Sequence, residues 1–388
     1  MAPTWNFARP HNEGGATTQA HVDFARDTYE REIGREGFFG AASHVYHRNP
    51  PNAWSSIEGA AKPRAFNPAS TATPAASPWD AQPLMHNAHV RVRYWRAEGS
   101  MDHLVRNGDG DELVFIHQGA GSLFCDFGHL PFESGDYLVL PRGTMWRIES
   151  DGPVEALLVE STNASYRLPD RGMLGRHALF DPGVLARPEL DGAFRDQRKA
   201  GPWQVRVKRR NAQTVVTFPF NPLDAVSWKG DLYPVRLNVR DFRPVTSHRV
   251  HLPPSAHTTF LSDRFVICTL APRPMESEPG AMKLPFFHSN DDYDEVVFYH
   301  RGRLRGRSAI VGEGTMTFHP SGVVHGPHPE ALPHMFEHPL KMLESYSVMI
   351  DTRDALEIAD LPAGTEIAGY AESWTGSIAV APDAQTVP

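Results

Sequence analysis

The 388-residue chain has little cysteine and no long hydrophobic run. Its two cysteines, Cys125 and Cys268, cannot make a disulfide scaffold and lack the spacing of a zinc or redox pair. No apolar run approaches the roughly 18 residues that a membrane helix needs, so we expect no membrane span. The first residues, MAPTWNFARPHNEGG, lack a charged segment followed by an apolar one, so we expect a cytoplasmic location.

The chain also lacks an excess of positive charge. It has 38 Lys and Arg against 46 Asp and Glu, a net charge of −8 at pH 7, and no block of basic residues. We therefore expect neither nucleic acid nor a membrane surface among its partners. The hydrophobic share of 40% and the mean hydropathy of −0.40 are ordinary for a globular protein in water.

Turn-forming residues are abundant, with 31 glycines and 34 prolines, about one residue in six. This content favours many short strands over long helices. Residues 62–83 are rich in Pro, Ala, Ser and Thr and predict an extended connection without regular structure. Before them, only Val22 to Arg35 has helical character. From His89 onward, short β-type runs such as HVRVRYW and DELVFIH alternate with turns, as in a sandwich or barrel.

These patterns divide the chain into four parts. Residues 1–85 are expected to form an N-terminal arm and linker, and residues 86–165 a first β-barrel. Residues 166–242 form an inter-barrel region with a strand at Thr214 to Phe218. Residues 243–388 carry a second series of strands and the tail.

An internal repeat links the two strand series. The segment LVRNGDGDELVFIHQG, ending at Gly119, aligns with FFHSNDDYDEVVFYHRG, ending at Gly302. Further along, GDYLVLPRGTMW aligns with GTMTFHPSGVVH. Because both elements recur in the same order, the sequence predicts a duplicated β-domain. The aligned pairs are Asn107/Asn290, Asp111/Asp294, Glu112/Glu295, Gly135/Gly314, Pro141/Pro320 and Gly143/Gly322.

The two copies differ in residues that can bind a metal. The second copy holds His288, Glu295 and His325, whereas the first has Val105 and Trp146 at the two histidine positions. Two His and one carboxylate are the ligand set of non-haem Fe(II) oxygenases. Zinc hydrolases also use such a set, so the ligands alone leave the metal open. Without imidazole partners, Glu112 is expected to make only a structural hydrogen bond.

The second copy resembles the cupin superfamily in two motifs. His288, Asn290, Glu295 and Gly302 match the first motif, and the second, G-x5-P-x-G-x2-H, ends at His325. The resemblance implies a mainly β bicupin of two double-stranded β-helix (jelly-roll) barrels with a turn-rich N-terminal arm, in which only the second barrel binds metal. Asn290 replaces the second His of the motif, which leaves a two-His-one-Glu set.

Within the cupins, residues 228–349 resemble homogentisate 1,2-dioxygenases. The similarity includes Trp228-x-Gly230 followed by Tyr233-Pro234, and His251-x-x-Pro254-Ser255. It also includes His319 and the triplet His325-Gly326-Pro327. The resemblance implies Fe(II) on His288, Glu295 and His325. It further implies His251 as a substrate-binding acid/base and His319 as a second catalytic pocket histidine. Asn290, on the ligand face, and Tyr293 are additional candidates for substrate binding.

The reaction that this resemblance implies is extradiol-type cleavage of homogentisate by O2 to maleylacetoacetate, a step of tyrosine and phenylalanine catabolism. The family also implies a homo-oligomer, a hexamer built from trimers. One substrate-pocket position differs, because Leu304 stands where the family has a tyrosine. The alternatives are therefore a related iron dioxygenase for another dihydroxy-aromatic acid, such as a gentisate-like one, a non-catalytic ligand-binding bicupin and, less favoured, a cupin isomerase.

Overall fold

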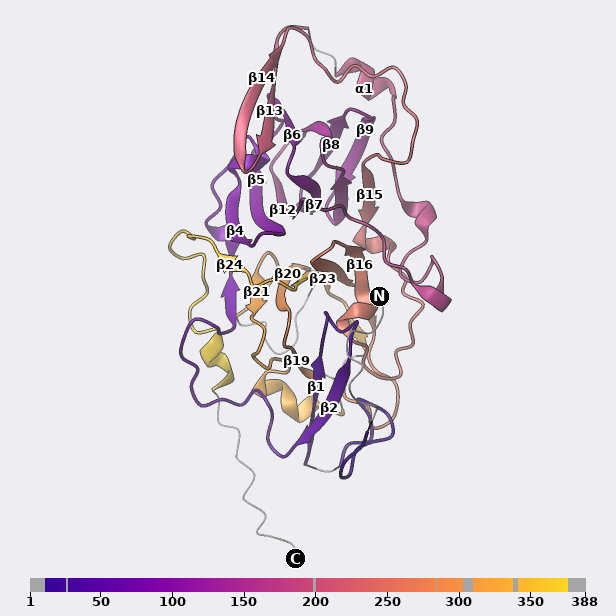
Figure 1. Ribbon diagram of the computed structural model, residues 1–388, viewed down its shortest axis with the longest axis vertical. Coiled ribbons are helices and arrows are strands. Elements are labelled where there is room, and N and C mark those ends of the chain that lie inside the picture. Colours follow the sequence, from indigo (N-terminus) through magenta and orange to yellow (C-terminus); the bar gives the residue numbers. More distant parts are fainter. Residues whose placement is uncertain are drawn as a thin grey trace, which may run out of the picture.

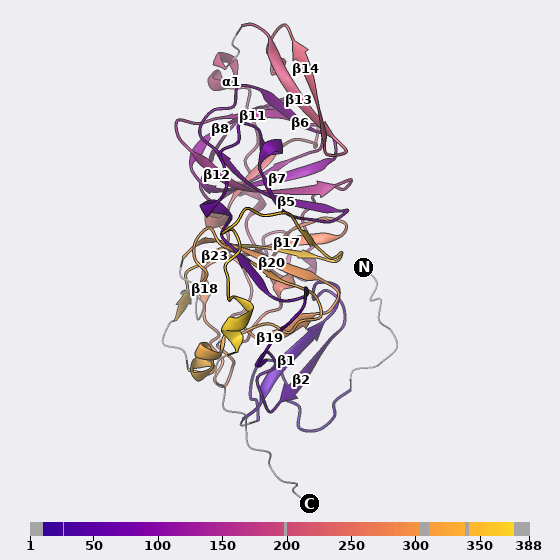
Figure 2. The same cartoon turned by 90° about the vertical axis from the view of Figure 1, so that its left-hand side faces the viewer.

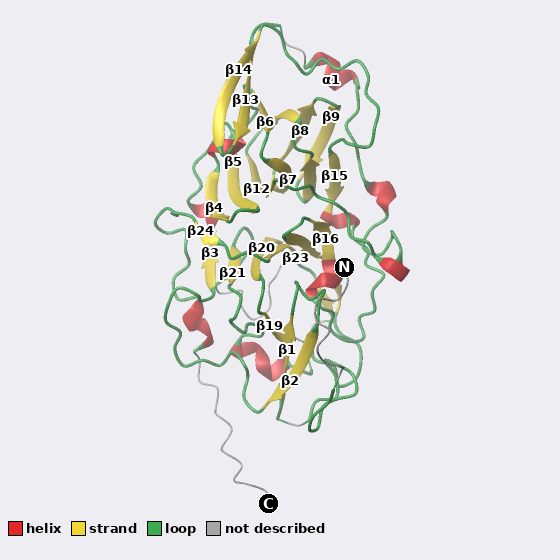
Figure 3. Ribbon diagram, in the orientation of Figure 1, coloured by secondary structure: helices red, strands yellow, loops and turns green. Residues whose placement is uncertain are grey.

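The computed structural model describes residues 11–25, 27–197, 200–283, 285–302, 310–337 and 341–375, and within them it is mainly β (Figure 3). The α-helix in these ranges is α1 (Gly192–Asp196), and the other helical pieces are short 3-10 turns. No helix in the same ranges is long and apolar enough to cross a membrane. The 3-10 turns are η1 (Pro68–Ser70), η2 (Pro78–Asp80), η3 (Gly172–Leu174), η4 (Pro182–Val184), η5 (Val239–Asp241), η6 (Pro254–His257), η7 (Pro329–His334) and η8 (Ala371–Trp374).

The strands stack in four β layers along the long axis of the molecule (Figures 1 and 2). The first two layers make the first domain, with sheet orders β14-β13-β6-β11-β8-β9 and β15-β10-β7-β12-β5-β4-β24. Their strands are β4 (Gln82–His86), β5 (Val90–Ala97), β6 (Leu104–Asn107), β7 (Gly110–Gln118), β8 (Ala120–Cys125), β9 (Gly128–Glu133), β10 (Asp136–Leu140), β11 (Met145–Glu149), β12 (Val154–Thr162), β13 (Trp203–Arg209), β14 (Ala212–Phe218), β15 (Val235–Asn238) and β24 (Glu357–Ile358).

The other two layers make the second domain. A six-stranded sheet has the order β16-β17-β23-β20-β21-β3, and a three-stranded sheet has the order β19-β1-β2. A short pair, β18-β22, stands apart from both. The strands are β1 (Tyr29–Gly34), β2 (Ala42–His47), β3 (Arg64–Phe66), β16 (Thr258–Leu261), β17 (Phe265–Leu270), β18 (Arg273–Pro274), β19 (Phe287–Asn290), β20 (Asp294–Arg301), β21 (Met316–His319), β22 (Met342–Leu343) and β23 (Tyr346–Thr352).

The seven-stranded sheet is buried on both faces. Val114 and Ile116 of β7 pack in the core of the first domain, whereas Leu113 and Phe115 pack in a core shared with the six-stranded sheet of the second domain. A strand covered on both faces forms a continuous apolar run rather than an alternating one. The prediction of a mainly β fold is confirmed, and the two β-domains are joined by a common core.

The repeat preserves one structural device in both domains. Asp111 and Asp294 each use both carboxylate oxygens to accept hydrogen bonds from two backbone amides. One of these amides belongs to the residue after Pro141 or Pro320, so the aspartate fixes the Pro-x-Gly corner. The amides belong to Arg142 and Tyr166 in the first domain, and to Ser321 and Leu356 in the second, at 2.8 or 2.9 Å.

The glycine that ends each first motif is required by its backbone. Gly119 and Gly302 have φ angles of 94° and 97°, in the left-handed region that favours glycine. A Cβ atom at these positions would collide with the carbonyl oxygens of Pro153 and Glu344, respectively. The pairing of these two glycines in the sequence alignment therefore has a common structural cause.

The N-terminal segment departs from the sequence prediction. The helical interpretation of Val22 to Arg35 is wrong, because Tyr29–Gly34 is strand β1, parallel to β19 and antiparallel to β2. Residues 62–83 are also more regular than predicted. They contain strand β3, which pairs with β21, and they bury Phe66 and Trp79. Strands β1 and β3 are therefore part of the sheets of the second domain, and Phe66 packs in the shared core, whereas Trp79 packs in the core of the first domain.

Candidate metal centre

Three side chains from three separate segments meet in the second domain. His288 lies on β19, Glu295 on β20, and His325 follows the Pro320 corner after β21. The backbones of His288 and His325 exchange two hydrogen bonds, of 2.9 and 3.0 Å, which brings their ring centroids to 4.1 Å. Glu295 Oε2 lies 3.6 Å from His288 Nε2, and Oε1 lies 3.5 Å from His325 Nε2.

The orientation of the two imidazoles fits a bound cation. Nδ1 of His288 lies 2.8 Å from the carbonyl oxygen of Phe286, and Nδ1 of His325 lies 3.2 Å from that of Val323. These contacts place the ring proton on Nδ1 and leave Nε2 as a lone-pair donor. Both Nε2 atoms are buried and have no hydrogen-bond partner among the described residues. The ligand atoms of the three residues all lie within 4.8 Å of one another, so a metal ion would satisfy them together.

The carboxylate of this group is held ionised. Burial raises the pKa of Glu295, but the imidazoles of His325, His288 and His319 outweigh burial and bring it well below its usual value. His319 Nδ1 lies 2.9 Å from Glu295 Oε1, and His319 Nε2 lies 3.1 Å from the Tyr370 hydroxyl. Both ring nitrogens of His319 are therefore occupied by the protein. Its ring also stacks on that of His325, with centroids 4.4 Å apart.

The three metal-ligand candidates lie on the wall of a cavity of about 270 Å³. His251 and His319 line the same cavity, as do the cationic residues Arg273 and Lys283. Asn290 and Tyr293 do not belong to the lining. Apolar lining residues include Leu252, Leu270, Phe286, Val297, Leu343 and Met349.

His251 is oriented by an acidic partner. Its Nδ1 lies 3.1 Å from Glu276 Oε1, and the same oxygen accepts a hydrogen bond of 2.7 Å from Arg273. Burial lowers the pKa of His251, although the Glu276 carboxylate opposes this. The ring is therefore neutral at neutral pH. Donation from Nδ1 to Glu276 leaves Nε2 as the proton acceptor.

Lys283 brings an incompletely neutralised positive charge to the cavity. Its Nζ donates hydrogen bonds to the backbone carbonyls of Glu276 and Glu278, at 2.7 and 2.9 Å. Among the described residues it has no carboxylate within ion-pair distance. Sequence reasoning missed Arg273, Glu276, Lys283 and Tyr370, because none of them belongs to a motif or a repeat.

Asn290 and Tyr293 lie toward the N-terminal hairpin. With its amide oriented to satisfy its neighbours, Asn290 donates to Asp292 Oδ1 at 2.9 Å and accepts from the Gly37 amide at 3.2 Å. The ring of Tyr293 lies against Gly37. These contacts tie the loop after β1 to the turn after β19. Leu304 lies outside the described residues.

The first domain fills the equivalent position with core residues. Val105 and Trp146 are paired across β6 and β11, as His288 and His325 are bridged in the second domain, and both are fully buried. Glu112 is also buried, and burial raises its pKa to about 8, against the charge of Lys208. Within the part of the chain that the structure describes, neither carboxyl oxygen of Glu112 has a hydrogen-bond partner, so the expected structural hydrogen bond is not found there.

A buried ammonium accompanies the acidic groups of the first domain. Glu160 lies opposite Glu112 in the strand register, and Lys208 donates to Glu160 and, at 3.2 Å, to Asp109. In the second domain Asp351 lies opposite Glu295, and burial followed by the charge of Glu295 raises its pKa well above the usual value. In the first domain, the ammonium of Lys208 thus neutralises Glu160, which lies opposite Glu112. In the second domain, the imidazoles of His288 and His325 face Glu295 instead.

Known proteins resemble the chain over most of its length. A family model described as the N-terminal part of homogentisate 1,2-dioxygenase matches residues 79–239. Over 94% of its length the chain is 28% identical to a Saccharolobus solfataricus protein described as a candidate dioxygenase, and the match covers 98% of that protein. Homogentisate 1,2-dioxygenases of Bradyrhizobium diazoefficiens and Rhodopseudomonas palustris are 26% and 27% identical over 74% and 73% of this chain. The chain spans only 66% and 65% of these two proteins.

Two solved structures are similar to the chain at low sequence identity. A cupin barrel protein from Leptotrichia buccalis gives a TM-score of 0.36 at 9% identity, covering 75% of this chain and 96% of that one. Protein YlbA from E. coli gives 0.35 at 10% identity, covering 78% and 96%. The sequence comparisons thus show a distant similarity of this chain to homogentisate 1,2-dioxygenases.

Proposed function

We propose that the chain is an Fe(II)-dependent, ring-cleaving dioxygenase that acts on a dihydroxy-aromatic acid. The observation that carries this proposal is the meeting of His288, Glu295 and His325 on the wall of a cavity that also holds a neutral histidine and two cations. The dioxygenase names of the relatives support the same reaction class. Homogentisate, cleaved to maleylacetoacetate, is the first candidate substrate.

The metal would be held by Nε2 of His288, Nε2 of His325 and the carboxylate of Glu295. This donor set suits ferrous iron and leaves coordination positions open. When bound, Fe(II) would supply coordination of the ring hydroxyl and the coupling of an electron-rich ring to O2. His319 acts through Glu295 in this proposal, because its Nδ1 contacts that carboxylate and its Nε2 contacts Tyr370.

His251 is the base in the proposed reaction. Its Nδ1–H is directed to Glu276, so Nε2 is free to accept the proton of a ring hydroxyl. The resulting phenolate is more electron-rich than the phenol and therefore reacts more readily with oxygen. The lowered pKa of His251 keeps the accepting form populated at neutral pH.

The acid group of the substrate has a binding partner in Lys283. Among the described residues, the Lys283 ammonium donates to backbone carbonyls and contacts no carboxylate, so its charge is available for a carboxylate at the cavity wall. Arg273 lies on the same wall but is already paired with Glu276. Apolar residues around the cavity are suited to the faces of an aromatic ring.

Oxygen consumption tests this function directly. Protein reconstituted anaerobically with Fe(II) is mixed with homogentisate, gentisate and other dihydroxy-aromatic acids in an oxygen electrode. We expect stoichiometric oxygen uptake with one of these acids, and its loss in Glu295→Ala. Uptake with gentisate rather than homogentisate would select the alternative substrate, whereas iron-loaded protein that consumes no oxygen with any acid would favour a ligand-binding bicupin.

A further inference from the structure

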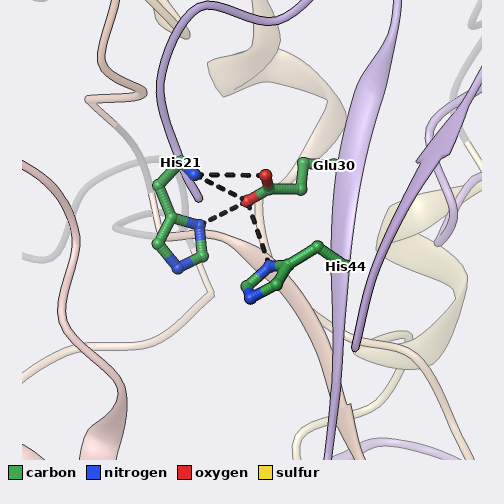
Figure 4. Close-up of side chains that lie close together, drawn as sticks. All are labelled: His21, Glu30 and His44. Atoms are coloured by element: carbon green, nitrogen blue, oxygen red, sulfur yellow. Dashed lines mark hydrogen bonds and ion pairs between the residues drawn. The ribbon is translucent and has the colours of Figure 1, made fainter. Parts of the chain in front are cut away.

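A second group of imidazole and carboxylate side chains lies on the N-terminal hairpin. In the register of β1 and β2, Glu32 is opposite His44 and Glu30 is opposite Tyr46, so these four side chains share one face of the hairpin. His21, from the segment before β1, packs onto this face (Figure 4). Glu30 is completely buried, His21 is 4% exposed, and His44 is partly buried.

The ligand atoms of His21, Glu30 and His44 converge on one point. His21 Nδ1 and His44 Nδ1 lie 2.5 and 3.5 Å from Glu30 Oε1, as drawn in Figure 4. All three ligand atoms lie within 4.8 Å of one another. Although both Nδ1 atoms are close to the carboxylate, neither has the geometry of a hydrogen bond to it, and both are buried without another partner. The two nitrogens therefore face the same carboxylate oxygen.

A second glutamate sets the orientation of His21. Glu32 Oε2 lies 3.2 Å from His21 Nε2. A histidine that donates one ring N–H to a carboxylate presents the other nitrogen as a metal ligand, and this arrangement is common behind metal-bound histidines. Glu30 is held in place as well, because both of its carboxylate oxygens accept a hydrogen bond from the backbone amide of His21, at 3.0 and 3.1 Å.

The hairpin group has the same pattern as His288, Glu295 and His325. In each, two imidazole nitrogens without hydrogen-bond partners among the described residues surround one carboxylate, which is buried in Glu30 and partly buried in Glu295. In each, a ligand histidine is also oriented through its other nitrogen. We propose that His21, Glu30 and His44 form a second divalent metal site, separate from the cavity. Two nitrogens and one oxygen, with a water completing a tetrahedron, suit Zn²⁺.

The position of this site indicates a structural role next to the cavity. The rings of His21 and His251 are 5.9 Å apart, and both rest against Phe286, at 5.1 and 4.7 Å. A metal ion would join the segment before β1 to both strands of the hairpin. It would thereby fix the wall against which His251 rests.

Zinc binding in a variant without the first site tests the proposal independently of the proposed function. Glu295→Ala protein is stripped with a chelator, incubated with Zn²⁺ and desalted, and its metal content and melting temperature are measured. We expect about one zinc per chain and a higher melting temperature than in the stripped protein. Adding His44→Ala should abolish both effects, because His44 is the most exposed ligand and its loss should leave the fold intact.

His47→Ala is the matched control. His47 lies on the same strand, three residues from His44 and on the opposite face of the hairpin. In the Glu295→Ala background this variant should still bind zinc. Anomalous scattering at the zinc edge should show the ion between His21, Glu30 and His44. Zinc content that His44→Ala leaves unchanged, or no anomalous peak there, would overturn the proposal and leave these residues as a metal-free imidazolium–carboxylate pair.

Discussion

At the scale of single residues, the pKa of an equivalent glutamate is shifted in opposite directions in the two domains. Glu295 is surrounded by imidazoles and is held ionised, whereas Glu112 has no hydrogen-bond partner and has a pKa of about 8. The difference follows from two positions, because Val105 and Trp146 replace the histidines with apolar core residues. The retained glutamate in the first domain is therefore a neutral acid below its raised pKa.

Glu112→Gln tests this protonation state. Burial raises the pKa of Glu112 from 4.5 to about 8. The contribution of protonated Glu112 to the free energy of unfolding is therefore complete below pH 4.5 and is lost as pH rises through about 8. Glutamine is neutral throughout and lacks this dependence. Between about pH 5 and pH 8, the stability of the variant relative to wild type should rise by a few kcal/mol. Denaturant unfolding at a series of pH values measures this difference. If the free energies of unfolding of wild type and variant changed in parallel with pH, the prediction would be contradicted.

His251→Gln tests the base. Under the proposed function the variant should retain its iron, because His251 is not among the ligand candidates. Its rate of oxygen uptake should fall by about 10² to 10⁴. Since protonation of His251 removes the acceptor, wild type should also lose rate as pH falls through the lowered pKa, whereas the variant should lack this limb. An unchanged pH–rate profile would exclude His251 as the base.

At the scale of elements, the corner after Pro320 brings His325 to the metal centre. Asp294 holds that corner through the amide of Ser321 and also binds the amide of Leu356. Asp111 makes the same two kinds of contact in the first domain. The part of the repeat that both copies share is thus the aspartate that holds the Pro-x-Gly corner. This contact forms whether or not a candidate ligand histidine follows the corner.

Asp294→Asn and Asp111→Asn form a matched pair. Each removes one acceptor and leaves a backbone amide unsatisfied, so each should lower the free energy of unfolding by about 1–3 kcal/mol. Only Asp294→Asn should also weaken iron binding, because only its corner carries a ligand histidine. Iron titration of both variants measures this, and equal iron affinities would show that the corner does not position His325.

The elements also show what the sequence could predict. The strands of both domains and the three ligand candidates follow from turn spacing and from the repeat, because each copy constrains the other. Strand β1 could not be found this way, since it is stabilised by parallel pairing with β19, a segment far along the chain. Lys283 and Tyr370 carry no motif, and only folding brings them to the cavity and to His319.

At the scale of the whole molecule, one core joins the domain that carries Val105 and Trp146 to the domain that carries the ligand candidates His288 and His325. The seven-stranded sheet of the first domain packs its second face on the six-stranded sheet of the second domain. The first domain therefore serves as a platform for the sheet that holds Glu295. Self-association into a hexamer stays a prediction, which light scattering of the purified protein would measure.

Introducing both histidines into the first domain tests this division of roles. In Val105→His/Trp146→His, Lys208 still neutralises Glu160 and Asp109 beside Glu112. The double variant should be destabilised by about 3–5 kcal/mol, because a buried Trp and Val are lost, while its iron content equals that of wild type. Additional iron bound in the first domain would contradict this prediction, because it would show that the two added histidines and Glu112 can form a metal site.

The most direct measurement is anomalous diffraction at the iron edge on crystals of protein reconstituted with Fe(II). The account predicts a peak at bonding distance from His288 Nε2, His325 Nε2 and the carboxylate of Glu295, and none beside Glu112. A peak beside Glu112, or iron-loaded crystals without a peak between those three side chains, would contradict it.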